Sequence, residues 1–129
     1  MNEFIVPLEV ENPDEPPRVD VHDEWRQFAL WLSGRYGLLN VDGHEIGLSP
    51  KLVNDLLAWG DAADALFDQD YPPDSLLPEG HYETGYELAK RVRAELPAEW
   101  IVTTNDPTTR AKVVLPLREL PPGLTNNLS

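Results

Sequence analysis

The segment from Asp68 to Glu79 carries carboxylates at a spacing that overlaps that of a calcium-binding loop. The acidic side chains stand at loop positions one, three, seven and twelve, and they are Asp68, Asp70, Asp74 and Glu79. The motif also needs an oxygen ligand at position five and glycine at position six, where this chain has Pro72 and Pro73. Because proline cannot adopt the sharp turn that the glycine makes, the sequence predicts no metal site and no cofactor.

Other residue types that could do chemistry also lack the neighbours that the chemistry needs. The three histidines, His22, His44 and His81, do not have metal-ligand spacing, and surface or half-buried positions suit them better than a catalytic role. Ser49 is not in a G-x-S-x-G context, and the chain has no cysteine. The sequence therefore predicts no catalytic residue, and we expect the protein not to be an enzyme.

Acidic residues dominate one continuous stretch of the chain. No lysine or arginine occurs from Leu52 to Ala89, whereas acidic residues recur throughout it: Asp55, Asp61, Asp64, Asp68, Asp70, Asp74, Glu79, Glu83 and Glu87. The net charge of the chain is -13, which argues against binding to nucleic acid or to an anionic membrane. A basic protein is the partner that this charge favours, and solubility alone is the alternative.

The length and composition set the class of protein. The chain has 129 residues, from which we expect one domain over residues 1–120 and a frayed C-terminal tail over residues 121–129. It has no cysteine, no basic and apolar leader at the N-terminus, and no apolar run of about 20 residues. These features indicate a cytoplasmic protein.

Two helices are predicted in the middle of the chain. Ser49 and Pro50 form a strong start signal, with the serine as N-cap, and the first helix extends to about residue 68. Tyr71 and the two prolines after it end the first helix and begin a loop. The second helix is predicted over residues 79–96.

The loop between the helices is short enough for an antiparallel hairpin. Gly85 lies in the middle of the second helix, where glycine costs about 1 kcal/mol relative to alanine. A close helix crossing against Ala62 or Ala63 would explain it.

Strands are predicted on both sides of the helices, over residues 4–11, 28–32, 36–41, 100–104 and 111–117. The stretch from Val19 to Val41 has a second interpretation, a helix whose apolar spacing runs from Trp25 to Leu32, but its glycines and aromatic residues favour strands. The order of elements predicts an α+β fold in which an antiparallel sheet carries the two-helix hairpin on one face.

The hairpin would bring much of the acidic charge to one end of the molecule. We expect the partner-binding residues to be Asp61, Asp64, Asp68, Asp70, Tyr71, Asp74 and Glu79. Among the tryptophans, Trp31, Trp59 and Trp100 are expected in the core. Trp25 could anchor an interface, although packing is the favoured interpretation.

The segment ALWLSGRYGLLNVDGHEIGLSPKLVNDLLAWGDAADALFDQDYPPDS, followed by GYELAKRVRAEL, resembles a group of small acidic actinobacterial proteins without an assigned activity. The shared pattern is a Trp-bearing strand, an L-S-P-x-L-x-x-x-L-x-x-W helix, an acidic D-x-D-x-P loop and a G-x-x-L-A-x-R-x-x-x-E-L helix. The resemblance covers residues 29–102 and supports the fold more than the function. In size and charge the chain is similar to bacterial immunity proteins.

Two functions are compatible with these features. The first hypothesis is an immunity-type binding protein that inhibits a cognate toxin, expected to be basic, through the acidic surface. The alternative is a structural or adaptor protein, encoded by a phage or an operon, that self-associates through an exposed sheet edge at Phe4–Leu8 and has no toxin partner.

Overall fold

The computed structural model describes residues 8–67, 70 and 77–117. Its elements, in chain order, are β1 (Pro17–Val21), β2 (Leu30–Gly34), β3 (Leu39–Val41), the short 3₁₀ turn η1 (His44–Ile46), α1 (Pro50–Asp64), α2 (His81–Glu95), β4 (Ile101–Asn105) and β5 (Lys112–Leu115). The predicted domain boundary near residue 120 and the tail lie outside the described residues. No helix in the described ranges is long and apolar enough to cross a membrane.

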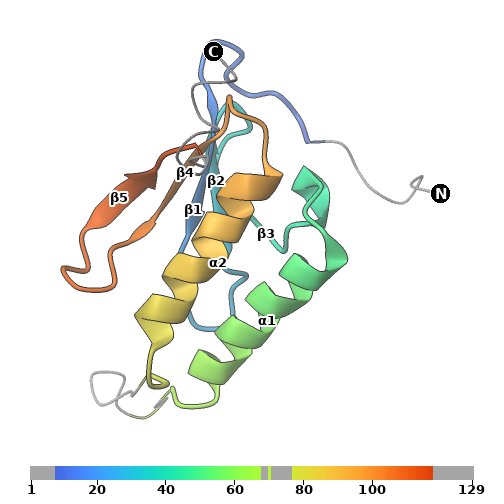
Figure 1. Ribbon diagram of the computed structural model, residues 1–129. Helices are drawn as coiled ribbons and strands as arrows, with labels where there is room; N and C mark the ends of the chain where they lie inside the picture. Colours follow the sequence, from blue (N-terminus) through green and yellow to red (C-terminus); the bar gives the residue numbers. More distant parts are fainter. Residues whose placement is uncertain (1–7, 68–69, 71–76, 118–129) are drawn as a thin grey trace.

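The five strands form one sheet, and the two helices lie side by side on one of its faces (Figure 1). The strand order is β3-β2-β1-β4-β5, and all neighbours are antiparallel except β1 and β4, which are parallel. The α+β class and the helix pair on one face are thus confirmed, with a sheet that is mostly antiparallel.

The core lies between the sheet and the helices. Residues alternate along each strand, so Val19 and Val21 of β1 are buried, whereas Arg18 between them faces the opposite side. The helices contribute buried residues at helical spacing, which are Leu52, Val53 and Leu56 of α1 and Leu88, Ala89 and Val92 of α2. Each fully buried aliphatic side chain contributes about 1.5–3 kcal/mol, so this layer is the main source of stability.

The central strand β1 was not predicted. Its sequence PRVDV begins with a proline and carries Arg18 and Asp20 at alternate positions, so it reads as the end of a polar loop. The predicted first strand, residues 4–11, is wrong over residues 8–11, which form no strand, and its remainder lies outside the described residues.

The ambiguous stretch between Val19 and Val41 is resolved in favour of strands, and the helical alternative is wrong. β2 and β3 form an antiparallel pair in which Leu30 lies opposite Val41. Gly34 at the end of β2 and Gly37 in the loop that follows both have a positive φ, 74° and 72°. Only glycine adopts this backbone conformation without a steric cost. The turn follows residue 34, whereas the predicted strands place it after residue 32.

The two helices are joined at both ends of the pair. At one end Ser49 caps α1 as predicted, because its hydroxyl oxygen accepts the Leu52 N–H at 3.3 Å. The Ser49 backbone N–H and hydroxyl each donate to the Glu95 carboxylate, both at 2.7 Å. The start of α1 is thereby tied to the end of α2.

The close crossing at Gly85 exists, but its partner is Trp59 rather than Ala62 or Ala63. A Cβ on Gly85 would lie only 2.5 Å from Cζ2 of Trp59. The Trp59 indole N–H also donates to the His81 carbonyl at 2.9 Å. Trp59 therefore fixes the distance between the helices at the end where α2 begins.

Candidate functional site

The described acidic residues of the predicted partner-binding set belong to the segments where α1 ends and α2 begins, at the lower end of the molecule in Figure 1. Asp61, Asp70 and Glu79 have exposed side chains. Asp68, Tyr71 and Asp74 lie outside the described residues. The described members of the predicted set therefore share one end of the helix pair.

Asp64 belongs to the same end but already has an intramolecular role. It is half-buried, and its two carboxylate oxygens accept the backbone N–H of Arg26 at 3.2 and 3.3 Å. Arg26 has a φ of 62°, a left-handed conformation that is uncommon for a residue other than glycine. Asp64 therefore holds the loop between β1 and β2 against the end of α1.

Aromatic stacking joins the same two segments. The rings of Trp25 and Phe67 are stacked, with centroids 4.5 Å apart and planes 16° from parallel. The Arg26 guanidinium lies over the Trp25 ring, 4.6 Å from its centroid. The sequence showed no sign of this contact, because Trp25 and Phe67 are far apart in the chain and neither belongs to a motif.

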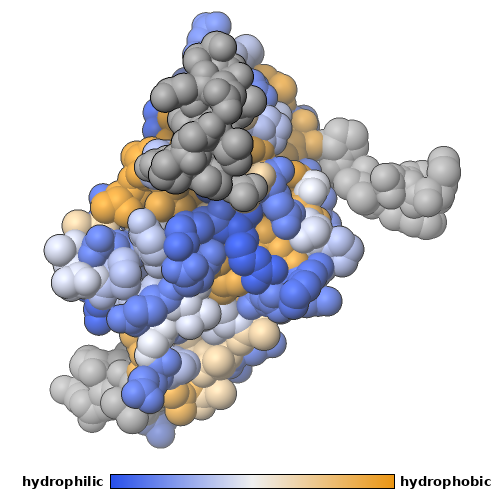
Figure 2. All heavy atoms as spheres, in the orientation of Figure 1, coloured by the Kyte–Doolittle hydropathy of each residue, from blue (hydrophilic) through white to orange (hydrophobic). Residues whose placement is uncertain are grey.

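We define the acidic end by five carboxylates in the segments that meet here. They are Glu24 in the loop between β1 and β2, Asp61 and Asp64 in the last turn of α1, and Asp70 and Glu79 between α1 and α2. Apolar side chains are exposed among them, including Leu66 at 44% and Leu77 at 46%. Figure 2 shows hydrophobic atoms beside hydrophilic ones at the lower end of the molecule. Exposed apolar side chains close to charged ones are a usual composition of a protein-binding surface.

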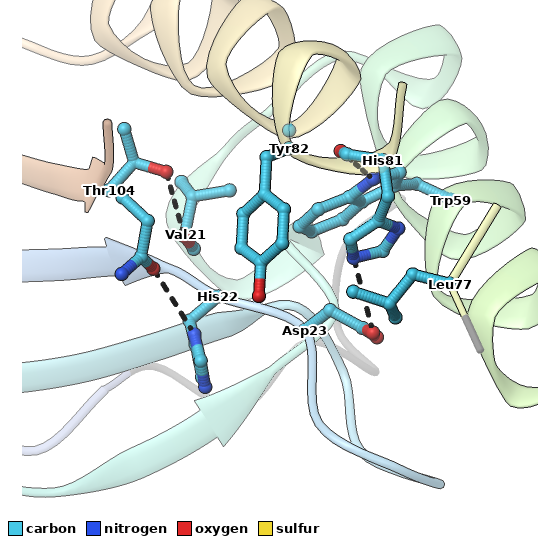
Figure 3. A pocket seen from close by; sticks show the side chains of 10 residues that line it. Val21, His22, Asp23, Trp59, Leu77, His81, Tyr82 and Thr104 are labelled. Carbon is cyan, nitrogen blue, oxygen red and sulfur yellow. Dashed lines mark hydrogen bonds and ion pairs between the residues drawn. The ribbon is translucent and has the colours of Figure 1, made fainter. Parts of the chain in front are cut away.

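Beneath the acidic end lies a buried pair, Asp23 and His81, whose side chains point toward each other in Figure 3. Oδ2 of Asp23 is 3.5 Å from Nε2 of His81, and the side chains are 12% and 5% exposed. The His81 ring stacks on Trp59 with centroids 4.6 Å apart. Within the described part of the chain, Asp23 Oδ1 and His81 Nδ1 are buried without a hydrogen-bond partner.

Burial decides how this pair titrates. Loss of solvation and, to a smaller extent, the nearby negative charge of Asp64 together raise the pKa of Asp23 to about 6, although His22 acts in the opposite direction. Burial also lowers the pKa of His81, with a smaller contribution from His22. At pH 7.5 the structure therefore holds a carboxylate against a neutral imidazole.

The pocket at this pair is too small for a substrate. Its volume is about 70 Å³, and ligand sites are typically about 300–1,000 Å³. Its lining includes Leu77 and Tyr82 beside the pair. No group of three or more His, Cys, Asp or Glu side chains in the described ranges could hold a metal. The arrangement suits a structural contact that can change its protonation state.

The histidine and tryptophan predictions have mixed outcomes. His81, expected at the surface or half-buried, is buried in the pocket at 6% exposure. Trp59 and Trp100 lie in the core as predicted. Trp31 does not. It is half-buried on the sheet face opposite the helices, where its indole N–H donates to the His22 carbonyl at 2.9 Å.

Comparison with known protein families gives a match. The model of a family described as Serratia CdiI immunity protein-like matches residues 17–106, more than half of the chain. The matched range begins with β1 and ends just after β4, so it includes both helices and the buried Asp23–His81 pair. No curated protein matches the chain.

Proposed function

The chain belongs to the Serratia CdiI immunity protein-like family, and on that premise we propose that it is an immunity protein that binds and neutralises a cognate protein toxin. The family match is the observation that carries this proposal. The action would be occlusion of the toxin by tight contact, with no reaction catalysed.

The acidic end is the surface that we assign to the toxin. Its exposed carboxylates Asp61, Asp70 and Glu79 would raise the rate of encounter with a basic toxin, because opposite charges steer association. The apolar side chains among them would then slow dissociation once water is excluded. Asp68, Tyr71 and Asp74, predicted from the sequence as contacts, belong to the same proposal.

Asp64 has a different part in this surface. Because it accepts the Arg26 N–H, its contribution is to position the loop between β1 and β2 rather than to contact the toxin. An Asp64→Asn variant should therefore weaken binding by loosening that loop, with little change in the salt dependence of association.

Growth rescue tests the proposal. Immunity genes usually lie beside toxin genes, so the toxin encoded next to this gene would be expressed alone and together with the chain. The account predicts that the wild type and a control double variant, Asp14→Lys with Glu9→Lys, restore growth. Both control residues are exposed and belong to the segment before β1, which lies in the upper part of Figure 1, whereas the acidic end lies in the lower part. Rescue should fail with the double variant that carries both Asp61→Lys and Glu79→Lys. Toxicity that the wild type does not relieve would overturn the function, and equal rescue by both double variants would overturn the assigned surface.

Self-association through a sheet edge is the second candidate. β3 is an edge strand; its first residue, Leu39, is 43% exposed, and Leu38 just before it is 90% exposed. The net charge of -13 opposes it, because two copies repel each other. A sedimentation coefficient that rises with protein concentration would favour this candidate, and a constant value would exclude it.

A further inference from the structure

A groove lies beside the loop between β1 and β2, on the sheet side that faces away from the helices. It is lined by Asp20, His22, Glu24, Trp25, Gln27 and Trp31. Asp20 and Trp31 are register partners in β1 and β2, and both alternate with residues of the buried core. The two indole rings therefore belong to one groove, one from the strand and one from the loop.

Most of the lining is fixed in place by hydrogen bonds. The Trp31 indole N–H donates to the His22 carbonyl at 2.9 Å. The Asp20 carboxylate accepts the Thr103 hydroxyl at 2.7 Å and the Lys112 ammonium at 2.8 Å. Glu24 lies 3.1 Å from Nε2 of His22, and its side chain is 56% exposed. A groove held in this way loses little conformational freedom when it binds a ligand.

The chemistry of the lining is that of a cation site. Indole faces attract cations, and carboxylates beside them pair with a guanidinium, whose planar shape allows stacking and paired hydrogen bonds at once. The chain already shows this preference, because the guanidinium of its own Arg26 lies over the Trp25 ring. Phe67 also stacks on the Trp25 ring and helps to hold it in place.

Resting on the function proposed above, we propose that this groove accepts an arginine side chain of the toxin, which replaces Arg26 at the Trp25 ring and pairs with Glu24. The groove is continuous with the acidic end, because Trp25 contacts Phe67 at the end of α1 and the Arg26 N–H bonds to Asp64. A second copy of the chain is a poor occupant, because its net charge of -13 would be repelled by the carboxylates.

The chain's four tryptophans give a direct test that needs no toxin. The full-length, ¹⁵N-labelled protein would be titrated with a hexa-arginine peptide while the four indole N–H signals are followed by NMR. We expect saturable shifts of the Trp25 and Trp31 signals and none at Trp59 and Trp100, which lie in the core. Hexalysine should bind at least threefold more weakly, and hexacitrulline, which keeps the shape without the charge, should not bind.

Glu24→Gln provides the variant, and Glu99→Gln is its matched control. Both glutamates have side chains 56% exposed and each contacts one basic residue, but Glu99 lies outside the groove. Glu24→Gln should weaken hexa-arginine binding at least threefold, whereas Glu99→Gln should not change it.

Three results would overturn the proposal: no saturable shift at Trp25 and Trp31, equal affinity for hexa-arginine and hexalysine, or equal effects of the two glutamine variants. Growth rescue by the wild type in any of these cases would leave the proposed function intact and remove only the arginine groove. If the wild type failed to rescue growth but the groove still bound hexa-arginine, the groove would be a guanidinium site whose occupant is not the toxin.

Discussion

The buried carboxylate of Asp23 allows a prediction whose magnitude follows from the structure. An aspartate in an unfolded chain has a pKa of about 3.9, and burial together with the charge of Asp64 raises that of Asp23 to about 6. Because each pKa unit corresponds to about 1.4 kcal/mol, holding this charge at pH 7.5 costs the folded state up to about 3 kcal/mol. The Asp23 side chain remains 12% exposed, and solvent at that edge screens part of this cost, so we expect about 1–2 kcal/mol.

Asp23→Asn should therefore stabilise the protein at pH 7.5. The variant keeps the shape of the side chain and removes the charge beside Asp64. The folded pKa is raised, so the wild type binds a proton on folding between about pH 6 and pH 4 and recovers the lost stability as the pH falls through that window. The advantage of the variant should shrink below pH 6 and vanish near pH 4.

Urea unfolding followed by circular dichroism at pH 7.5, 6 and 4.5 would measure this difference. Asp14→Asn, at an exposed position, is the control and should leave the free energy of unfolding unchanged at every pH. An Asp23→Asn variant less stable than the wild type at pH 7.5 would refute the argument. It would mean that His81 is protonated and that Asp23 gains more from that ion pair than it loses by burial.

Further predictions concern the packing and the ends of α2 and α1, each measured as the free energy of unfolding. Gly85→Ala should cost about 1–2 kcal/mol, because crowding against Trp59 outweighs the gain in helix propensity, and a stabilised variant would contradict the crossing. Ser49→Ala should cost about 1 kcal/mol through loss of the cap, and an unchanged value would show that Glu95 caps α1 without it. Arg93→Met should cost about 2–4 kcal/mol, since the buried guanidinium donates to three backbone carbonyls, and a cost near zero would show that water replaces it.

Local signals in the sequence were sufficient for the helices and for the last two strands. The Ser49–Pro50 pair and the helical spacing after it predict α1, and a turn between two apolar runs predicts β4 and β5. The sheet as a whole was harder to predict. β1 lies at its centre, yet only alternate residues of β1 are apolar and the parallel pairing with β4 has no local signal.

The position of the acidic end in the fold could be predicted in outline. Charge spacing on two antiparallel helices was enough to place Asp61 and Glu79 at one end. The loop between β1 and β2, which also belongs to this end, was not predictable. Its position depends on contacts between segments far apart in the chain, such as the Asp64 carboxylate with the Arg26 N–H and Asp23 with His81. Such contacts form only when the β1–β2 loop and the helices fold together.

The central claim is that the acidic end binds a basic toxin, and the association rate constant tests it most directly. It would be measured by stopped flow with the purified toxin from low to high salt. Three proteins would be compared: the wild type, the double variant Asp61→Lys with Glu79→Lys, and the control double variant Asp14→Lys with Glu9→Lys. The account predicts that the first double variant associates at least about tenfold more slowly at low salt and that the difference disappears at high salt. Association equally fast in both double variants, with the same salt dependence, would contradict it.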